Sequence, residues 1–158
     1  MIKKILYLHG LDAVPKPEKI AILQQAGSVS APKLNYRALK DDFTLFNELA
    51  DSIKIEQITN IVGSSFGGYM GFYLSEFCKI PAILFNPAIS FKSLDVPVTK
   101  IFSDIPKTII LGIRDDVVNP IETEEFIIKN NYTNSNIVKL DFEHQVSEEI
   151  FALALNYL

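Results

Sequence analysis

Ile61-Val62-Gly63-Ser64-Ser65-Phe66-Gly67-Gly68 is the stretch around which the rest of the chain is interpreted. An apolar run ends here in the pattern Gly-x-Ser-x-Gly, and an apolar stretch with helical spacing begins at once. A strand, a sharp turn with a serine at its tip and a following helix together present a reactive serine above the edge of a sheet. The stretch therefore predicts a nucleophile elbow.

Two adjacent serines compete for the tip of this turn. Gly63 and Gly67 lie two residues before and two residues after Ser65, where strand and helix pass so closely that a Cβ would collide. If Ser64 were at the tip, a valine and a phenylalanine would occupy those crowded positions. We therefore predict Ser65 as the nucleophile.

Strand and helix patterns alternate about six times along the chain, with strands expected from short apolar runs and helices from apolar stripes. The first helix is expected to end at Gly27, and Asp41 and Asp42 form an acidic start for the second. The expected strands cover 4–8, 28–32, 58–62, 82–85, 108–112 and 137–140, and the expected helices cover 19–25, 43–53, 66–78, 121–129 and 147–158.

This alternation predicts one α/β domain over residues 1–158, a three-layer α/β/α sandwich around a mostly parallel sheet. Right-handed crossovers place every loop that follows a strand at the same edge of such a sheet. The loops after five of the strands carry His9, Ser65, Asn86, Asp115 and His144. We expect these five side chains to converge on one rim.

The composition excludes several classes of protein. The chain has 158 residues, 48% of them hydrophobic, and a net charge of −4 without a basic stripe, so no nucleic-acid partner is expected. The apolar run after the first lysines is too short for a signal peptide, and no segment reaches the roughly 18 apolar residues of a membrane span. We therefore expect no membrane partner and a cytoplasmic location.

The lone Cys78 excludes an internal disulfide and a multi-cysteine metal site, and we expect it to be buried.

A serine hydroxyl needs a base within hydrogen-bond reach, and that base needs an acid to orient it. The chain has only two histidines, and the expected chain order of serine, acid and histidine selects His144. His9 follows the first strand, where we expect it to hold its loop in place.

The acid should follow a strand that lies between the serine and the histidine in the chain. Asp115 and Asp116 both lie in the loop after the strand 108–112, and the residue pattern leaves the choice between them open. Glu143 adjoins His144, but neighbouring side chains usually diverge, so we interpret it as a surface acid.

The negative oxygen of a tetrahedral acyl intermediate needs backbone N–H donors. One donor comes from the residue after the nucleophile, here Phe66, and the other from the loop after the first strand, here Leu11. This chemistry needs no metal and no organic cofactor.

Three stretches resemble the α/β-hydrolase superfamily and, within it, the small bacterial YqiA-type esterases: residues 6–11, 61–69 and 81–88. The resemblance implies a minimal fold without a large cap, esterase activity on short acyl esters, and Ser65, Asp115 and His144 as the catalytic triad. The chain departs from the family in being shorter between residues 88 and 108, and in having Arg114 where a glycine is usual.

The segment 88–107 has a mixed pattern, and its Phe91, Leu94 and Phe102 are candidates to line an acyl pocket. The sequence as a whole favours a serine hydrolase of the carboxylesterase or thioesterase type, whose partner is a small-molecule ester or thioester. Two alternatives stay open: a non-catalytic interaction protein on a hydrolase scaffold, and a lyase or perhydrolase with the same triad.

Overall fold

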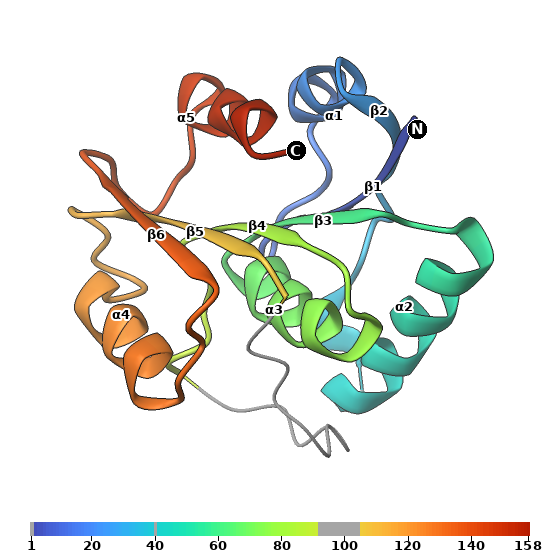
Figure 1. The fold of residues 1–158 in the computed structure, drawn as a ribbon. Helices are drawn as coiled ribbons and strands as arrows, with labels where there is room; N and C mark the ends of the chain where they lie inside the picture. Colours follow the sequence, from blue (N-terminus) through green and yellow to red (C-terminus); the bar gives the residue numbers. More distant parts are fainter. Residues whose placement is uncertain (1, 40, 92–104) are drawn as a thin grey trace.

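The computed structural model describes residues 2–39, 41–91 and 105–158, and in these ranges six strands form one parallel sheet (Figure 1). The strand order is β2-β1-β3-β4-β5-β6, and every neighbouring pair is parallel. The strands are β1 (Lys3–Leu8), β2 (Gly27–Ser30), β3 (Asn60–Ser64), β4 (Ala82–Phe85), β5 (Lys107–Gly112) and β6 (Ser135–Leu140).

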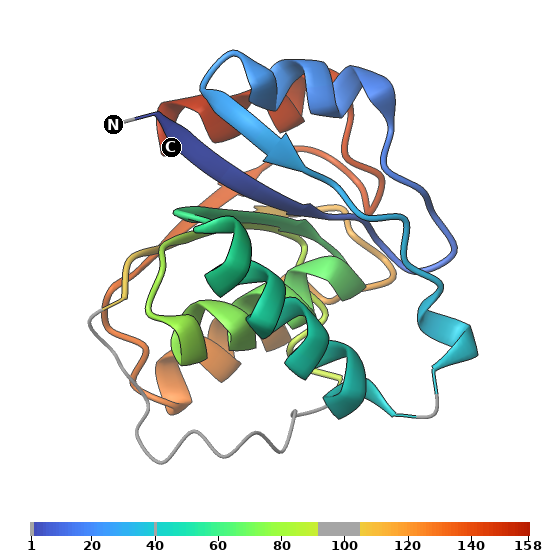
Figure 2. The same cartoon turned by 90° about the vertical axis from the view of Figure 1, so that its right-hand side faces the viewer.

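Helices cover both faces of this sheet, as Figures 1 and 2 show from two directions. One face carries α1 (Pro17–Gln24) and α5 (Glu148–Ala152), and the other carries α2 (Asp42–Glu56), α3 (Phe66–Cys78) and α4 (Pro120–Lys129). Two short 3-10 helices complete the described elements, η1 (Tyr36–Ala38) and η2 (Leu153–Asn156). The predicted three-layer α/β/α sandwich with a parallel sheet is confirmed.

The central strands are buried on both faces, which explains why their sequences are apolar without alternation. Every residue of β3, β4 and β5 is buried. The helix α3 lies under the middle of the sheet with Tyr69, Met70, Phe72 and Leu74 almost fully buried. This helix begins directly after Ser65, so the core that fixes α3 also fixes the serine.

A buried ion pair joins α3 to β5. The Lys107 ammonium donates a hydrogen bond to the Glu76 carboxylate, and the two side chains are 1% and 3% exposed. Burial lowers the pKa of Lys107, and the bonded Glu76 carboxylate partly opposes this change. The ammonium also lies 5.4 Å from the centre of the Phe72 ring.

The element boundaries differ from the expected ones around α1. Gly27 begins β2 and does not end the helix, whose last turn is closed at Gln25. The buried residues of α1 are Leu23 and Lys19, a lysine that the apolar pattern did not select.

None of the described helices is long and apolar enough to cross a membrane. Likewise, over the three described ranges no group of three or more His, Cys, Asp or Glu side chains is arranged to hold a metal ion. Cys78 is half-buried at the end of α3, and burial raises the pKa of its thiol to about 11.

Candidate active site

Ser65 connects β3 to α3 in a backbone conformation that residues other than glycine rarely adopt, with φ 52° and ψ −115°. Such a conformation costs roughly 1–3 kcal/mol and persists only when the surrounding structure imposes it. Here the Ser65 N–H donates to the carbonyl of Phe85 at 2.9 Å, and its carbonyl accepts from Tyr69 and Ala88. Hydrogen bonds from three directions therefore hold the serine at the tip of the turn.

The two glycines that flank Ser65 allow strand and helix to approach each other. A Cβ on Gly63 would lie 2.5 Å from the carbonyl oxygen of Gly67, and a Cβ on Gly67 would lie 2.2 Å from that of Leu8. Both distances are far below a van der Waals contact. The geometry is that of the predicted elbow, with Ser65 at its tip and Ser64 as the last residue of β3.

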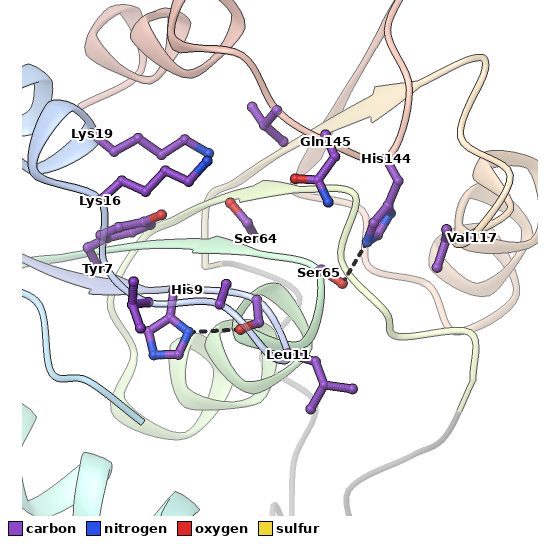
Figure 3. Close-up of a pocket in the computed structure, with 14 residues that line it drawn as sticks. Tyr7, His9, Leu11, Lys16, Lys19, Ser64, Ser65, Val117, His144 and Gln145 are labelled. Atoms are coloured by element: carbon purple, nitrogen blue, oxygen red, sulfur yellow. Dashed lines mark hydrogen bonds between the residues drawn. The ribbon is translucent and has the colours of Figure 1, made fainter. Parts of the chain in front are cut away.

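His144 lies in the loop after β6 and touches both Ser65 and Asp115. Its Nε2 lies 3.0 Å from Ser65 Oγ, and its Nδ1 lies 2.8 Å from Asp115 Oδ2 (Figure 3 shows the bond to the serine). A carboxylate only accepts, so Nδ1 carries the proton and Nε2 is the acceptor that faces the serine hydroxyl. The structure thus brings Ser65, His144 and Asp115 into one hydrogen-bonded series.

Asp115 is held from its other side by its own loop. Its Oδ1 accepts hydrogen bonds from the N–H groups of Val117 and Val118, both at 2.8 Å, and its side chain is fully buried. Asp116 is exposed. Of the two candidate acids, the structure places Asp115 against the histidine.

Asn86 connects the ends of three strands, a function that sequence reasoning missed. Its side-chain N–H₂ donates to the carbonyls of Glu143 and His144 at 3.2 and 3.3 Å, while its Oδ1 accepts from Gly112 N–H at 2.8 Å. The residue is 1% exposed and has a φ of 43°, a left-handed conformation that asparagine tolerates well. Asn86 thus fixes the main chain that carries the histidine.

His9 is bonded within the loop after β1. Its Nε2 accepts from the N–H of Leu34 at 2.9 Å, so its Nδ1 donates to the carbonyl of Gly10 at 2.8 Å. The Tyr36 hydroxyl donates to the His9 carbonyl at 2.8 Å. The imidazole has the loop-holding function that we expected.

The loop that His9 holds brings Leu11 to the cavity beside Ser65, and Phe66 is the first residue of α3 (Figure 3). The amino end of a helix favours negative charge. The assignment of the Leu11 and Phe66 N–H groups as oxyanion donors stays a prediction.

A cavity of about 260 Å³ opens over the serine. Ser65, His144 and Leu11 line one part of it. The rest of its wall comes from β1 and β3, from α1 and the loop before it, from the loop after β5 and from the loop that follows His144 (Figure 3). A cavity of this volume suits a small substrate.

Two residues flank the site without entering it. Arg114 forms ion pairs with Asp141 at 2.5 Å and Glu143 at 3.1 Å, so it ties together the loops that carry Asp115 and His144. Glu143 is exposed, as expected of a surface acid.

Of the proposed acyl-pocket residues, Phe91 is 61% exposed, whereas Leu94 and Phe102 lie outside the described residues.

Over the described residues the fold is that of the α/β hydrolases, without a large cap. The monoacylglycerol lipase of Paleococcus ferrophilus is 14% identical with a TM-score of 0.77, over 98% of this chain and 93% of that one. An α/β-hydrolase enzyme, MGS-MChE2, from the metagenome of Mar Chica lagoon sediments is 15% identical with a TM-score of 0.73, over 99% and 90%. The carboxylesterase of Bacillus cereus is 16% identical with a TM-score of 0.68, over 99% and 87%.

Residues 4–98 match the Uncharacterised protein family UPF0227, and the chain belongs to that family. The matched range includes the loop after β1, the elbow and Asn86, and ends before Asp115 and His144. The structural neighbours confirm the α/β-hydrolase fold that this resemblance implied.

Proposed function

We propose that this chain is a serine hydrolase that cleaves small or short-chain carboxylic esters or thioesters through an acyl-enzyme intermediate. The observation that carries the proposal is the hydrogen-bonded series from Asp115 through His144 to Ser65. Support also comes from the structural neighbours, since a lipase and a carboxylesterase share the fold.

In the first half of the reaction His144 Nε2 removes the hydroxyl proton of Ser65 as Oγ attacks the acyl carbon. The buried Asp115 carboxylate stabilises the imidazolium that forms. The N–H groups of Phe66 and Leu11 hold the negative oxygen of the tetrahedral intermediate. When the intermediate collapses, His144 gives its proton to the departing alkoxide or thiolate.

The second half of the reaction repeats these steps with water as the nucleophile. His144 removes a proton from the water, which attacks the acyl carbon that is bound to Ser65. The proton then returns to Ser65 Oγ as the carboxylic acid leaves. The strained backbone of Ser65 keeps its Oγ in one position through both halves, so little reorganisation is needed.

Turnover of p-nitrophenyl acetate and p-nitrophenyl butyrate tests the proposal. We expect Ser65→Ala to lower kcat/KM about a thousandfold or more, because the acyl-enzyme no longer forms. Ser52→Ala is the matched control and should keep wild-type rates, because this partly exposed serine of α2 bonds only to the Glu48 carbonyl of its own helix. Equal rates in wild type and Ser65→Ala would refute the proposal.

A further inference from the structure

One end of the cavity over Ser65 is lined by polar groups that the proposed reaction does not use. Tyr7 and Ser64 lie on its floor, and Lys16 and Lys19 reach over it from the loop before α1 and from α1 itself (Figure 3). In that view both amino groups and the Ser64 hydroxyl point toward the same hollow. All four side chains offer a hydrogen-bond donor.

Lys19 is a buried cation that has no ion-pair partner among the described residues. It is 8% exposed, and within the described residues its ammonium makes no hydrogen bond and no ion pair. Its near neighbour is the ring of Phe151, 4.9 Å away at the centroid, while the Glu148 carboxylate acts from farther off. Burial, together with the positive charge of Lys16, lowers the pKa of Lys19 to about 8. Two ammonium groups that repel each other would both gain from an anion between them.

The unbonded hydroxyl of Ser64 is a second, independent observation that points to a ligand at this end of the cavity. The residue is 8% exposed, and its buried Oγ has no hydrogen-bond partner among the described residues. Native structures leave few buried hydroxyl groups unbonded, because such a group has lost its water without gaining a partner. Tyr7 is also buried, and burial raises the pKa of its phenol to about 12, so the phenol remains a donor at neutral pH.

We propose that this end of the cavity binds an anionic group of the substrate, so that the enzyme acts on esters in which one half carries a carboxylate or a phosphate. The inference rests on the proposed function and deepens it. Lys16 and Lys19 provide the charge, and Ser64 and Tyr7 donate hydrogen bonds to the same anion. Since Ser65 and His144 line the same small cavity, an anion bound here places a nearby ester carbonyl beside the nucleophile.

Matched pairs of esters test the inference and separate the possible sources of the anion. Monomethyl glutarate against methyl hexanoate places a carboxylate in the acyl half. Acetoxyacetate against butyl acetate places the carboxylate in the alcohol half. 2-Phosphoethyl acetate, also compared with butyl acetate, places a phosphate in that half. We expect wild type to prefer the charged member of at least one pair by about tenfold or more in kcat/KM, because a charge pair in a partly desolvated site contributes that much.

Substitution of the lysines shows whether they cause this preference. Lys19→Met keeps the apolar stem over Phe151, and we expect it to reduce the ratio of kcat/KM for charged over neutral ester about tenfold. Lys16→Met should reduce the same ratio, and since Lys16 is exposed this variant is expected to fold normally. Lys16→Glu should make the neutral ester the better substrate. The matched control is Lys54→Met on α2, which should keep the wild-type ratio.

The failure of this inference differs from the failure of the proposed function. A wild-type ratio near one for every pair, or a ratio that no Lys16 or Lys19 variant changes, would overturn the anion site while ester hydrolysis stands. No turnover of any ester by wild type would overturn both.

Discussion

At the scale of single residues, Asp115 and Asp116 are adjacent in the chain and differ in burial. Asp115 is buried and bonded to His144 and to two backbone N–H groups, whereas Asp116 is exposed. The residue pattern alone left the choice between them open, because the direction of a side chain in a loop depends on what the loop packs against. Here Val118 is buried and turns the loop inward, whereas Val117 is 54% exposed.

Replacing Asp115 with asparagine should disable the base. An amide at this position favours the histidine tautomer that carries its proton on Nε2, which leaves no acceptor for the serine hydroxyl. We expect Asp115→Asn to lower kcat about a thousandfold or more and Asp116→Asn to change it less than about threefold. Steady-state kinetics with p-nitrophenyl acetate measure both. A larger loss in Asp116→Asn would show that the acid is assigned wrongly.

Asn86 should act as a positioning residue. Asn86→Asp keeps the left-handed backbone conformation but replaces the N–H₂ donor with an oxygen that faces the carbonyls of Glu143 and His144. Leaving buried groups without partners costs about 1–3 kcal/mol in the free energy of unfolding. Because the His144 main chain loses its bond, we also expect kcat to fall about tenfold with little change in KM.

Urea denaturation and steady-state kinetics together test this role of Asn86. Asn47→Asp, on the exposed side of α2, is the surface control and should leave both measurements unchanged. A loss of stability with wild-type kcat would mean that Asn86 only supports the fold.

At the scale of elements, the approach of α3 to the ends of β1 and β3 determines where the serine lies. An added Cβ on Gly67 would meet main-chain oxygens of Leu8 and His9 at 2.2 and 2.4 Å. Gly71, one turn later, faces side chains instead, with Ile61 Cγ2 at 3.0 Å and Leu84 Cδ2 at 3.3 Å. A flexible side chain can shift, and a strand main chain cannot.

This difference predicts unequal effects of the same substitution along one helix. Gly67→Ala should lower the free energy of unfolding by about 3 kcal/mol and abolish most ester turnover, because the elbow must open. In Gly71→Ala the gain in helix propensity of about 1 kcal/mol offsets part of the crowding, so we expect a small change in stability. Thermal melts followed by circular dichroism compare the two variants. Equal destabilisation would contradict the tight elbow.

The Glu76–Lys107 pair links α3 to β5, the strand that leads to Asp115. Glu76→Ala leaves a buried ammonium without its partner, for which we expect a loss of about 3–5 kcal/mol in the free energy of unfolding. The double variant Glu76→Leu with Lys107→Met removes both charges and should recover most of that loss. Chemical denaturation of the wild type and of both variants measures these changes in the free energy of unfolding. A double variant as unstable as Glu76→Ala would show that the pair itself stabilises the fold.

At the scale of the whole molecule, most of the fold could be predicted from the sequence. Apolar strands that are buried on both faces, helices with apolar stripes and the glycines of the elbow are local signals, and α3 and β4 occur where the pattern places them. Parallel topology then brings the loops after the strands to one edge, so Ser65, Asp115 and His144 were expected to meet. The meeting of these loops is a consequence of topology and needs no long-range signal.

The remaining features depend on contacts that leave no pattern in the sequence. Asn86 bonds to main-chain carbonyls nearly sixty positions away, and a carbonyl is the same in every residue. Lys19 lies four residues before Leu23, so it shares the buried stripe of α1. A lysine at that position is nevertheless predicted to be exposed, unless the cavity beside it is known. That spacing is the one signal that marks Lys19 in advance.

Covalent labelling of the serine tests the central claim most directly. Incubation with a fluorophosphonate, followed by digestion and mass spectrometry, locates the modified side chain among all hydroxyl groups of the chain. The account predicts one adduct, on Ser65, which forms in step with the loss of p-nitrophenyl acetate turnover and is absent in Ser65→Ala and strongly slowed in His144→Ala. An unlabelled protein that still hydrolyses the ester, or an adduct on Ser64 instead, would contradict it.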